Sequence, residues 1–555
     1  MSPGIRCNAA RILGHGALLV AIGFACGAAI AQDTVAEALR ARIEQLRSGR
    51  EVSVDGARIA SRNLIPEFYE RRGLRPAWTR PEQARALLEL VEASSAHGLD
   101  PADYHAAALR RLAETPSGAA AVAGRELVLT DALVRLVYHL HFGKADPREL
   151  YPGWSFARSL GKIDPPAALE AMLAAPRLAD AVERFAPQLP AYRQLREALV
   201  GLRAIEARGG WQQLAPGPSL KPGMRDARVA ALRARLAVSG DLAPDAGAGA
   251  EVFDAALEAA VRHFQERHGF EADGAAGRRT LQALNVGVGA RIDQVRVNLE
   301  RLRWVARDLA GDFLIVDIAG FTARLFLDGR LAWSSRTVVG RPYRRSPVFR
   351  AEMRYLVLNP TWTVPPTILR QDVLPKAARD PAYLARSHMQ VVDAAGNPVD
   401  AAALDWARFR GAGFPYQIVQ APGDDNALGK IKFMLPNPHA VYLHDTPSRR
   451  LFERSERAFS SGCIRLERPL ELAVLLLDDA AQWSAQALRA AIDTGQTRTL
   501  PVKRQVPVLV LYFTAQAGED GALRFSPDLY GRDARVLAAL GAPFRFAPLE
   551  RRRTR

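Results

Sequence analysis

The pattern of hydrophobic and polar residues divides the chain into a helical first part and a β-rich last part. Up to residue 215, apolar residues recur at helical spacing, for example over 127–142, where the run stops at Gly143. Beyond residue 310 the residues alternate or are β-branched, as over 321–326, and Asp328-Gly329 predicts a hairpin turn. The pattern therefore predicts a multidomain α+β protein.

A small three-helix module is predicted between these parts. Gly209-Gly210 and the Pro/Gly-rich stretch 215–223 mark a boundary, and Gly269 and Asp273-Gly274 end one later helix and turn towards the next. The residues that repeat at helical spacing and should face inward are Val229, Leu232, Leu236, Phe253, Leu257, Val261, Phe264, Leu281 and Leu284.

The β-rich part is predicted to contain an insertion and to continue to residue 513. Strands are expected at 332–339, 355–358, 417–420, 440–443 and 507–513, and a helix over 470–477. Residues 367–412 are helical in character and punctuated by proline, so we expect a capping subdomain that stands over the sheet.

The first 31 residues have the character of a cleavable signal peptide. Arg6 and Arg11 precede an apolar stretch that ends Ala29-Ile30-Ala31, a small-x-small cleavage pattern. A membrane anchor is the alternative, since the stretch approaches spanning length. No other segment is apolar enough to span a bilayer, so we expect an exported, periplasmic protein without a transmembrane segment once the leader is removed.

The charge of the chain bears on its partners. The formal net charge is +16, or +14 without the two arginines of the leader. In an exported protein this charge favours an anionic wall or membrane surface over nucleic acid. An Arg-rich surface without any binding role is an equally acceptable interpretation.

Cys463 is the only cysteine outside the leader, and it provides the candidate chemistry. A lone thiol in an oxidising compartment has no disulfide partner, so it is either buried and inert or kept for its reactivity. His444 lies nineteen residues upstream, and the two can form a thiolate–imidazolium pair in which His444 is the general base and acid. The N–H groups of Gly462 and Cys463 would form an oxyanion hole, and Arg465 would hold a carboxylate or steady the loop.

These residues resemble the catalytic motif of L,D-transpeptidases of the YkuD type. In that motif a His, then Gly or Asp and Thr, precede Ser/Thr-x-Gly-Cys-(Ile/Val)-Arg; here they are His444-Asp445-Thr446 and residues 460–465. Much of the family has His where this chain has Ser461. The group that orients His444 therefore stays open between a backbone carbonyl and Ser461.

The resemblance extends over nearly the whole mature chain. The runs 339–341, 346–349, 359–365, 426–433 and 435–437 are similar to the large periplasmic branch of the family, 98–104 to its scaffold domain, and 261–269 with Asp273-Gly274 and Gly277 to a peptidoglycan-binding module. The implied division is a signal peptide (1–31), an α-helical scaffold domain (32–215), the peptidoglycan-binding module (224–287), a mostly β catalytic domain (297–500) with a helical capping insertion (367–412), and a C-terminal extension (501–555).

The resemblance implies a cysteine acyltransferase of cell-wall organisation and cell shape. Cys463 would attack diaminopimelate in a donor tetrapeptide, release D-alanine, and pass the thioester to diaminopimelate of a second stem. The implied partners are peptidoglycan stem peptides, glycan strands and cell-wall synthesis proteins. No metal or cofactor is implied, and carbapenems would acylate the same thiol. Alternatives are an L,D-carboxypeptidase or endopeptidase, a lipoprotein-to-wall transferase, and a non-catalytic wall-binding scaffold.

Further residues are candidates for substrate contact, each with a structural alternative. Tyr442 and Trp362 are candidates to line the substrate groove. The alternative for Tyr442 is packing within its strand, and the alternative for Trp362 is a place in the hydrophobic core. Ser460 either contacts substrate or closes a turn. His439 and His444 are five apart and lack acidic or cysteine companions at metal spacing, which disfavours a zinc peptidase.

Overall fold

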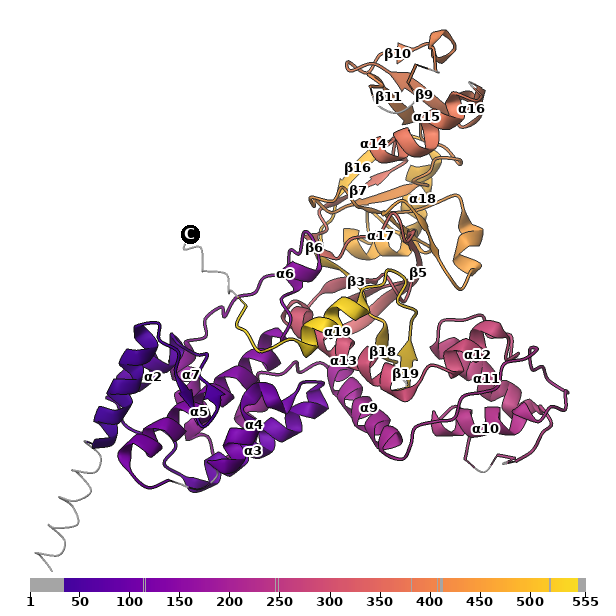
Figure 1. Cartoon of the computed structure of the whole chain (residues 1–555). Helices are drawn as coiled ribbons and strands as arrows, with labels where there is room; N and C mark the ends of the chain where they lie inside the picture. Colours follow the sequence, from indigo (N-terminus) through magenta and orange to yellow (C-terminus); the bar gives the residue numbers. More distant parts are fainter. Residues whose placement is uncertain are drawn as a thin grey trace, which may run out of the picture. The chain divides into compact units, whose positions relative to one another are not determined.

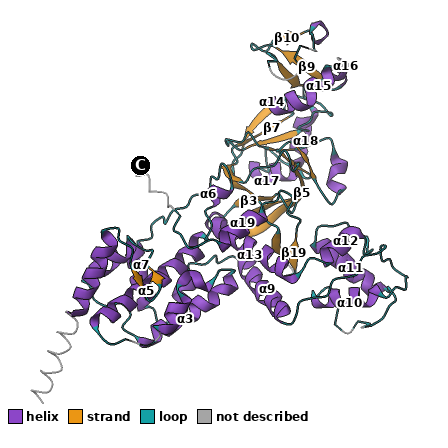
Figure 2. Cartoon of the chain, viewed as in Figure 1, coloured by secondary structure: helices purple, strands orange, loops and turns teal. Residues whose placement is uncertain are grey.

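The computed structural model describes residues 34–547, apart from 113, 115, 245, 248, 381, 407, 410–412, 519 and 520. The expected leader lies outside the described residues. The chain forms two compact units: Met1–Ala145 with Arg158–Gln188 and Leu540–Arg555, and Asp146–Ala157 with Leu189–Ala539. The first is helical apart from one hairpin, and the second combines helices with a large sheet, as the colours of Figure 2 show. The multidomain α+β class is confirmed.

The first unit is built around one long buried helix, α5 (Ala119–Phe142), which covers the predicted helical run. Within the described ranges, no helix of the protein is both long and apolar enough to cross a bilayer. The first unit also contains β1 (Ser53–Val54), β2 (Ala57–Arg58), α2 (Leu64–Arg71), α3 (Pro81–Ala93), η1 (Ser94–His97), η2 (Pro101–Tyr104), α4 (Ala106–Arg111), α7 (Pro165–Ala174) and α8 (Leu178–Glu183).

The hairpin β1–β2 was not expected in this helical unit. Its turn is Asp55-Gly56, and both residues have positive φ, +51° and +78°. This dipeptide is a strong signal for a two-residue hairpin turn, because glycine and aspartate tolerate the left-handed backbone.

The small module has the three predicted helices, α10 (Arg228–Val238), α11 (Ala255–Arg267) and α12 (Arg278–Leu284). All nine residues predicted to face inward lie in its core. Asp254 begins α11 as an N-cap whose side chain accepts a hydrogen bond from the Leu257 N–H at 2.9 Å. The helix α13 (Val288–Val305) follows the module and packs against α9 (Pro190–Ala207).

The core of the second unit is an eleven-stranded sheet (Figure 1). Its strand order is β16-β7-β12-β13-β15-β5-β4-β3-β17-β6, and β14 pairs with β5 beside this path. The strands are β3 (Phe313–Asp317), β4 (Thr322–Leu327), β5 (Arg330–Gly340), β6 (Phe349–Glu352), β7 (Tyr355–Leu358), β12 (Ile431–Met434), β13 (Leu443–His444), β14 (Ala458–Ser460), β15 (Ile464–Leu466), β16 (Arg498–Pro501) and β17 (Pro507–Leu511).

The sheet continues past residue 500 into the segment expected to be a C-terminal extension. The strand β17 pairs in parallel with β3 and antiparallel with β6, so it lies inside the sheet. Its residues 508–511 are all buried, which explains their unbroken apolar run. After it come β18 (Ala515–Ala517), β19 (Leu523–Phe525) and α19 (Asp533–Gly541), while α6 (Pro147–Leu150), η3 (Ala306–Asp308), α17 (Pro469–Leu477) and α18 (Ala485–Asp493) complete this unit outside the insertion and its flanking segments.

The insertion after β8 (Trp362–Thr363), here called the cap, contains strands as well as the expected helices. Its helical turns are α14 (Pro366–Ile368), η4 (Leu369–Val373), α15 (Leu374–Ala377), α16 (Ala382–Arg386) and η5 (Ala401–Ala403). Within 367–412, β9 (Met389–Val392) and β10 (Pro398–Val399) join β8 and β11 (Gln417–Gln420) in a separate four-stranded sheet. The description of the insertion as helical is therefore incomplete, because β9 is stabilised by pairing with β11, a partner distant in sequence.

Candidate active site

The register of three neighbouring strands brings the candidate residues onto one face of the sheet. In the pairing of β12, β13 and β15, Lys432 lies opposite His444, and His444 lies opposite Arg465. Residues directly opposite each other share a face, and so do residues two apart along a strand. Tyr442 and Cys463, each two residues earlier, therefore extend the same face. We call these five residues the thiol face.

The turn that presents Cys463 is held by two serine hydroxyls. The Ser460 Oγ donates to the Cys463 carbonyl at 2.5 Å and accepts from the Gly462 N–H at 3.1 Å. The Ser346 Oγ donates to the Gly462 carbonyl at 2.8 Å. Gly462 has φ +119°, which a residue with a side chain rarely adopts. The buried Ser460 hydroxyl is thus already hydrogen-bonded within the turn, in both its donor and its acceptor role.

The two backbone N–H groups expected to form an oxyanion hole differ in whether another protein group already accepts their hydrogen bond. The Gly462 N–H is engaged by Ser460, whereas the Cys463 N–H has no partner among the hydrogen bonds of the described residues. The Cys463 N–H is therefore the donor free to stabilise an oxyanion in this conformation.

His444 is buried, and its Nδ1 is fixed by the backbone. The Nδ1–H donates to the Asp445 carbonyl at 2.5 Å, and the imidazole also has a hydrogen bond to the backbone of Leu428. The Ser461 hydroxyl instead accepts a hydrogen bond from Arg344 Nη1 at 2.8 Å. Of the two partners left open by the sequence, the carbonyl is the one that contacts His444.

Burial keeps both the thiol and the imidazole neutral. It raises the pKa of Cys463, although a hydrogen bond with Tyr442 and the charges of Lys432 and Arg465 oppose the rise. Burial, together with the positive charge of Arg465, lowers the pKa of His444 to about 3. The resting pair is thus a thiol and a neutral imidazole rather than the expected thiolate–imidazolium.

Two cations on the thiol face have no carboxylate partner in the described part of the chain. Neither Lys432 nor Arg465 forms an ion pair there, and the Arg465 Nε is buried without a hydrogen-bond acceptor. Lys432 Nζ lies 4.2 Å from the centre of the Tyr442 ring. Burial lowers the pKa of both cations. Lys432 was not among the sequence candidates, because only its register opposite His444 reveals it.

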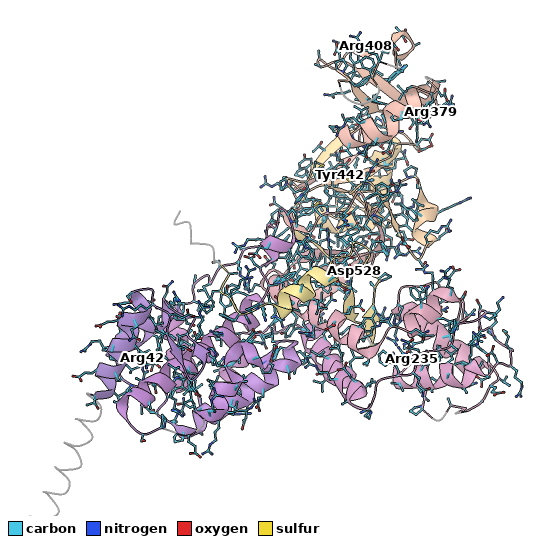
Figure 3. The ribbon with its side chains drawn as sticks, viewed as in Figure 1. Arg42, Arg235, Arg379, Arg408, Tyr442 and Asp528 are labelled. Carbon is cyan, nitrogen blue, oxygen red and sulfur yellow. The ribbon has the colours of Figure 1, made fainter. Side chains whose placement is uncertain are left out.

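The aromatic candidates connect the thiol to the cap. Tyr442, labelled in Figure 3, hydrogen-bonds through its side chain to Cys463 and to Trp362. Trp362, in β8, is 9% exposed and belongs to the hydrophobic core of the cap, against which Tyr442 packs. Trp362 is thus a core residue that also contacts the ring beside the thiol.

A second connection to the cap runs through Arg344, which sequence reasoning missed. Besides bonding Ser461, Arg344 forms an ion pair with Asp372, and its Nη2 donates to Gln371 Oε1 at 2.7 Å. Both partners lie in η4 of the cap. The guanidinium thereby ties the residue two before Cys463 to the insertion, a link between segments that are far apart in sequence.

Family comparisons match three parts of the chain. Residues 311–502 match the L,D-transpeptidase catalytic domain, 225–284 the family described as "Putative peptidoglycan binding domain", and 63–199 the scaffold domain. A Haemophilus influenzae protein named "Putative L,D-transpeptidase" is 36% identical over 264 residues, which are 47% of this chain and 53% of that protein. The chain thus spans about half the length of this curated relative.

One solved structure was also compared with the chain. It is the L,D-transpeptidase (residues 123–326) from Xylanimonas cellulosilytica, which is 14% identical with a TM-score of 0.17, over 54% of this chain and 99% of the other. This match adds nothing to the description of the fold.

Proposed function

Because residues 311–502 match the L,D-transpeptidase catalytic domain, we propose that the chain crosslinks peptidoglycan through a thioester on Cys463. The observation that carries the proposal is the thiol face. It combines a half-buried thiol, an imidazole whose Nδ1–H donates to the Asp445 carbonyl, and two cations without carboxylate partners in the described chain. Such a face is suited to an acyl donor that carries carboxylates.

In the proposed acylation, the Cys463 Sγ attacks the carbonyl of diaminopimelate in a donor tetrapeptide. The thiol proton passes to His444 Nε2, and the Cys463 N–H stabilises the oxyanion. The carbon–nitrogen bond to the terminal D-alanine then breaks, and the imidazolium returns the proton to the leaving amine. Lys432 and Arg465 would hold donor carboxylates and favour the developing thiolate.

In the proposed second half-reaction, the side-chain amine of diaminopimelate on another stem attacks the thioester. His444 takes a proton from this amine, and the thiol leaves with a proton. The product joins two third-position residues. Water as acceptor would give a carboxypeptidase or endopeptidase, and an amine of a lipoprotein would give a wall attachment enzyme. The same thiol would be acylated by carbapenems.

The match to a peptidoglycan-binding domain supports the wall as the place of action. Together with the leader predicted over residues 1–31, it supports an extracytoplasmic, periplasmic location. A non-catalytic wall-binding scaffold would need only the module. The unpaired cations beside Cys463 favour the enzyme, because burying a charge without a partner costs stability that a scaffold has no reason to lose.

The test is mass spectrometry of the mature protein incubated with a disaccharide-tetrapeptide, beside Cys463→Ala. A dimer that lacks one D-alanine, with a thioester adduct on the wild type alone, is the expected result. Tripeptide without dimer would reassign the chain to hydrolysis. Product of equal yield from Cys463→Ala would remove the thiol from the mechanism, and absence of both adduct and product would favour the scaffold.

A further inference from the structure

A second cationic pocket, here called the rear pocket, is lined by residues that flank Ser346, whose hydroxyl holds the Gly462 carbonyl next to Cys463. Its volume is about 490 Å³. The residues that line it are 150–153, Arg345, Pro347, Val348, His439, Gly531, Arg532 and Arg535. It contains neither Cys463 nor any other residue of the thiol face.

The rear pocket has positive charge that nothing on its own walls neutralises. Arg345, Arg532 and Arg535 line it, and no aspartate or glutamate is among the described lining residues. The hydrogen bonds that the three arginine side chains make go to backbone carbonyls, such as that of Ser346 at 3.4 Å from Arg532 Nη2. Uncompensated guanidinium groups around a cavity are the usual setting for a bound anion.

Two buried nitrogen atoms of the rear pocket lack partners. Arg532 Nη1 and His439 Nε2 are inaccessible and make no hydrogen bond within the described residues. A buried donor without an acceptor is costly, and a rotation of the Arg532 side chain that brings Nη1 to a ligand oxygen in the pocket would remove that cost. Gly153, with φ +77°, lets the wall approach His439 closely, since a Cβ there would collide with the imidazole.

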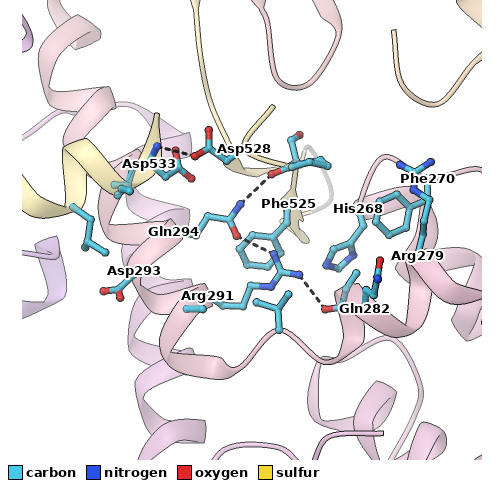
Figure 4. A pocket seen from close by; sticks show the side chains of 18 of the residues that line it. His268, Phe270, Arg279, Gln282, Arg291, Asp293, Gln294, Phe525, Asp528 and Asp533 are labelled. Atoms are coloured by element: carbon cyan, nitrogen blue, oxygen red, sulfur yellow. Dashed lines mark hydrogen bonds between the residues drawn. The ribbon is translucent and has the colours of Figure 1, made fainter. Parts of the chain in front are cut away.

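In another cavity of the same unit, the positive charge of the lining arginine lies beside hydrogen-bond acceptors and carboxylates. In Figure 4, Arg291 donates to Gln294 Oε1 at 2.8 Å and to the Ala283 carbonyl at 3.1 Å. Carboxylates at Asp293 and Asp528 also line that cavity. The rear pocket differs because no carboxylate lines it, and the nearby Asp528 accepts a hydrogen bond from the backbone N–H of Arg532 and not from its guanidinium.

The rear pocket shares a wall with the support of the catalytic turn. Arg345 precedes Ser346, whose hydroxyl bonds the Gly462 carbonyl. Tyr530 donates to the Gly340 carbonyl at 2.6 Å, and Arg532 lies over its ring at 5.0 Å from the centre. A ligand in the pocket would therefore contact the loop that holds Gly462.

We propose that the rear pocket binds a carboxylate of a second peptidoglycan stem peptide, apart from the thiol. The anion class follows from the unbalanced arginines and the two unpartnered nitrogens. The peptide as its source rests on the proposed function, since a wall crosslinking enzyme meets stems that end in carboxylates. Free phosphate is the other source of the same chemistry.

The test measures binding without turnover. The mature chain carrying Cys463→Ala and Arg465→Met, which weakens the thiol face, is titrated calorimetrically with a stem tripeptide as the free acid and as its C-terminal amide. Adding Arg345→Ala with Arg535→Ala, two exposed residues, should weaken free-acid binding at least tenfold. Arg330→Ala, an exposed arginine on the β4–β5 hairpin, is the matched control and should change nothing.

Several outcomes would overturn the assignment. Equal free-acid binding by the parent, the double variant and the control would do so, and so would equal affinity for acid and amide. Phosphate binding without peptide binding would assign the pocket to a small inorganic anion instead. Because no thioester is needed, failure of the proposed function would leave these readouts intact.

Discussion

Charge that is removed from water is treated in opposite ways around Asp131, in the first unit, and on the thiol face, in the second. In the first, Asp131 is fully buried and accepts hydrogen bonds from the Ser61 N–H at 2.8 Å, Arg135 Nε at 2.7 Å and His105 Nε2 at 2.8 Å. Although burial pushes its pKa upward, the bonds from His105 and the charge of Arg135 hold that pKa below its usual value. On the thiol face, Lys432 and Arg465 are half-buried with no carboxylate partner in the described chain, and the Arg465 Nε is buried without an acceptor.

This difference distinguishes charged residues that stabilise the fold from charged residues that are available to bind a ligand. A charge with a full set of partners stabilises one conformation, and its partners are all protein groups. A charge without them costs stability and is free to bind something else. The comparison predicts that changes around Asp131 affect folding, whereas changes on the thiol face affect reaction rate.

The largest expected effect is on stability. Asp131→Ala would leave Arg135 buried without its anion and should cost about 3–5 kcal/mol of unfolding free energy. Urea denaturation measures it, with Glu92→Ala as control, because the exposed pair of Glu92 with Arg110 should contribute at most about 1 kcal/mol. If Asp131→Ala loses no more unfolding free energy than the control, the proposed difference between Asp131 and the thiol face is wrong.

The next effect is on rate. Arg465→Met should slow thioester formation about 10²-fold, because a donor to the substrate is lost. Its unfolding free energy should stay level or rise, because an uncompensated buried cation is replaced by an apolar side chain. Intact-mass kinetics and urea denaturation give the two values. A destabilised variant with normal kinetics would make Arg465 a structural residue.

His444 should make the unfolding free energy depend on pH, and this effect is of intermediate size. Its folded pKa is lowered to about 3, so the stability that it contributes is present above about 6.5 and is lost as pH falls. Between pH 7 and pH 5 only the unfolded chain takes up the proton, which should lower the unfolding free energy by about 2 kcal/mol. His444→Gln should lack this component, and equal losses in both proteins would show that His444 is not held neutral.

The smallest effect concerns the link to the cap. Arg344→Ala removes the bonds to Ser461 and Asp372 and should slow acylation about tenfold through a less ordered turn. Arg386→Ala, which removes the exposed pair with Asp380 elsewhere in the cap, is the control. If both variants acylate at the wild-type rate, the link has no role in positioning the thiol.

The sequence predicts those parts of the candidate site that local patterns determine. Cys463 and His444 are predicted from their motifs, and strands such as β7 and β11 are predicted from short runs of residues that favour strands. Lys432 was missed because its role depends on strand register. Arg344 and the rear pocket were missed because they depend on contacts between segments distant in the chain, such as Arg344 and Ser461, which are 117 residues apart.

The strand β17 also has a consequence for synthesis. It lies between β3 and β6, yet it is made almost two hundred residues after β3. Until residues 507–511 leave the ribosome, two strand edges in the sheet stay open, and such edges readily pair with other chains. The sheet cannot close while the polypeptide is still growing, so assembly of the catalytic fold is postponed until nearly the whole chain has been made.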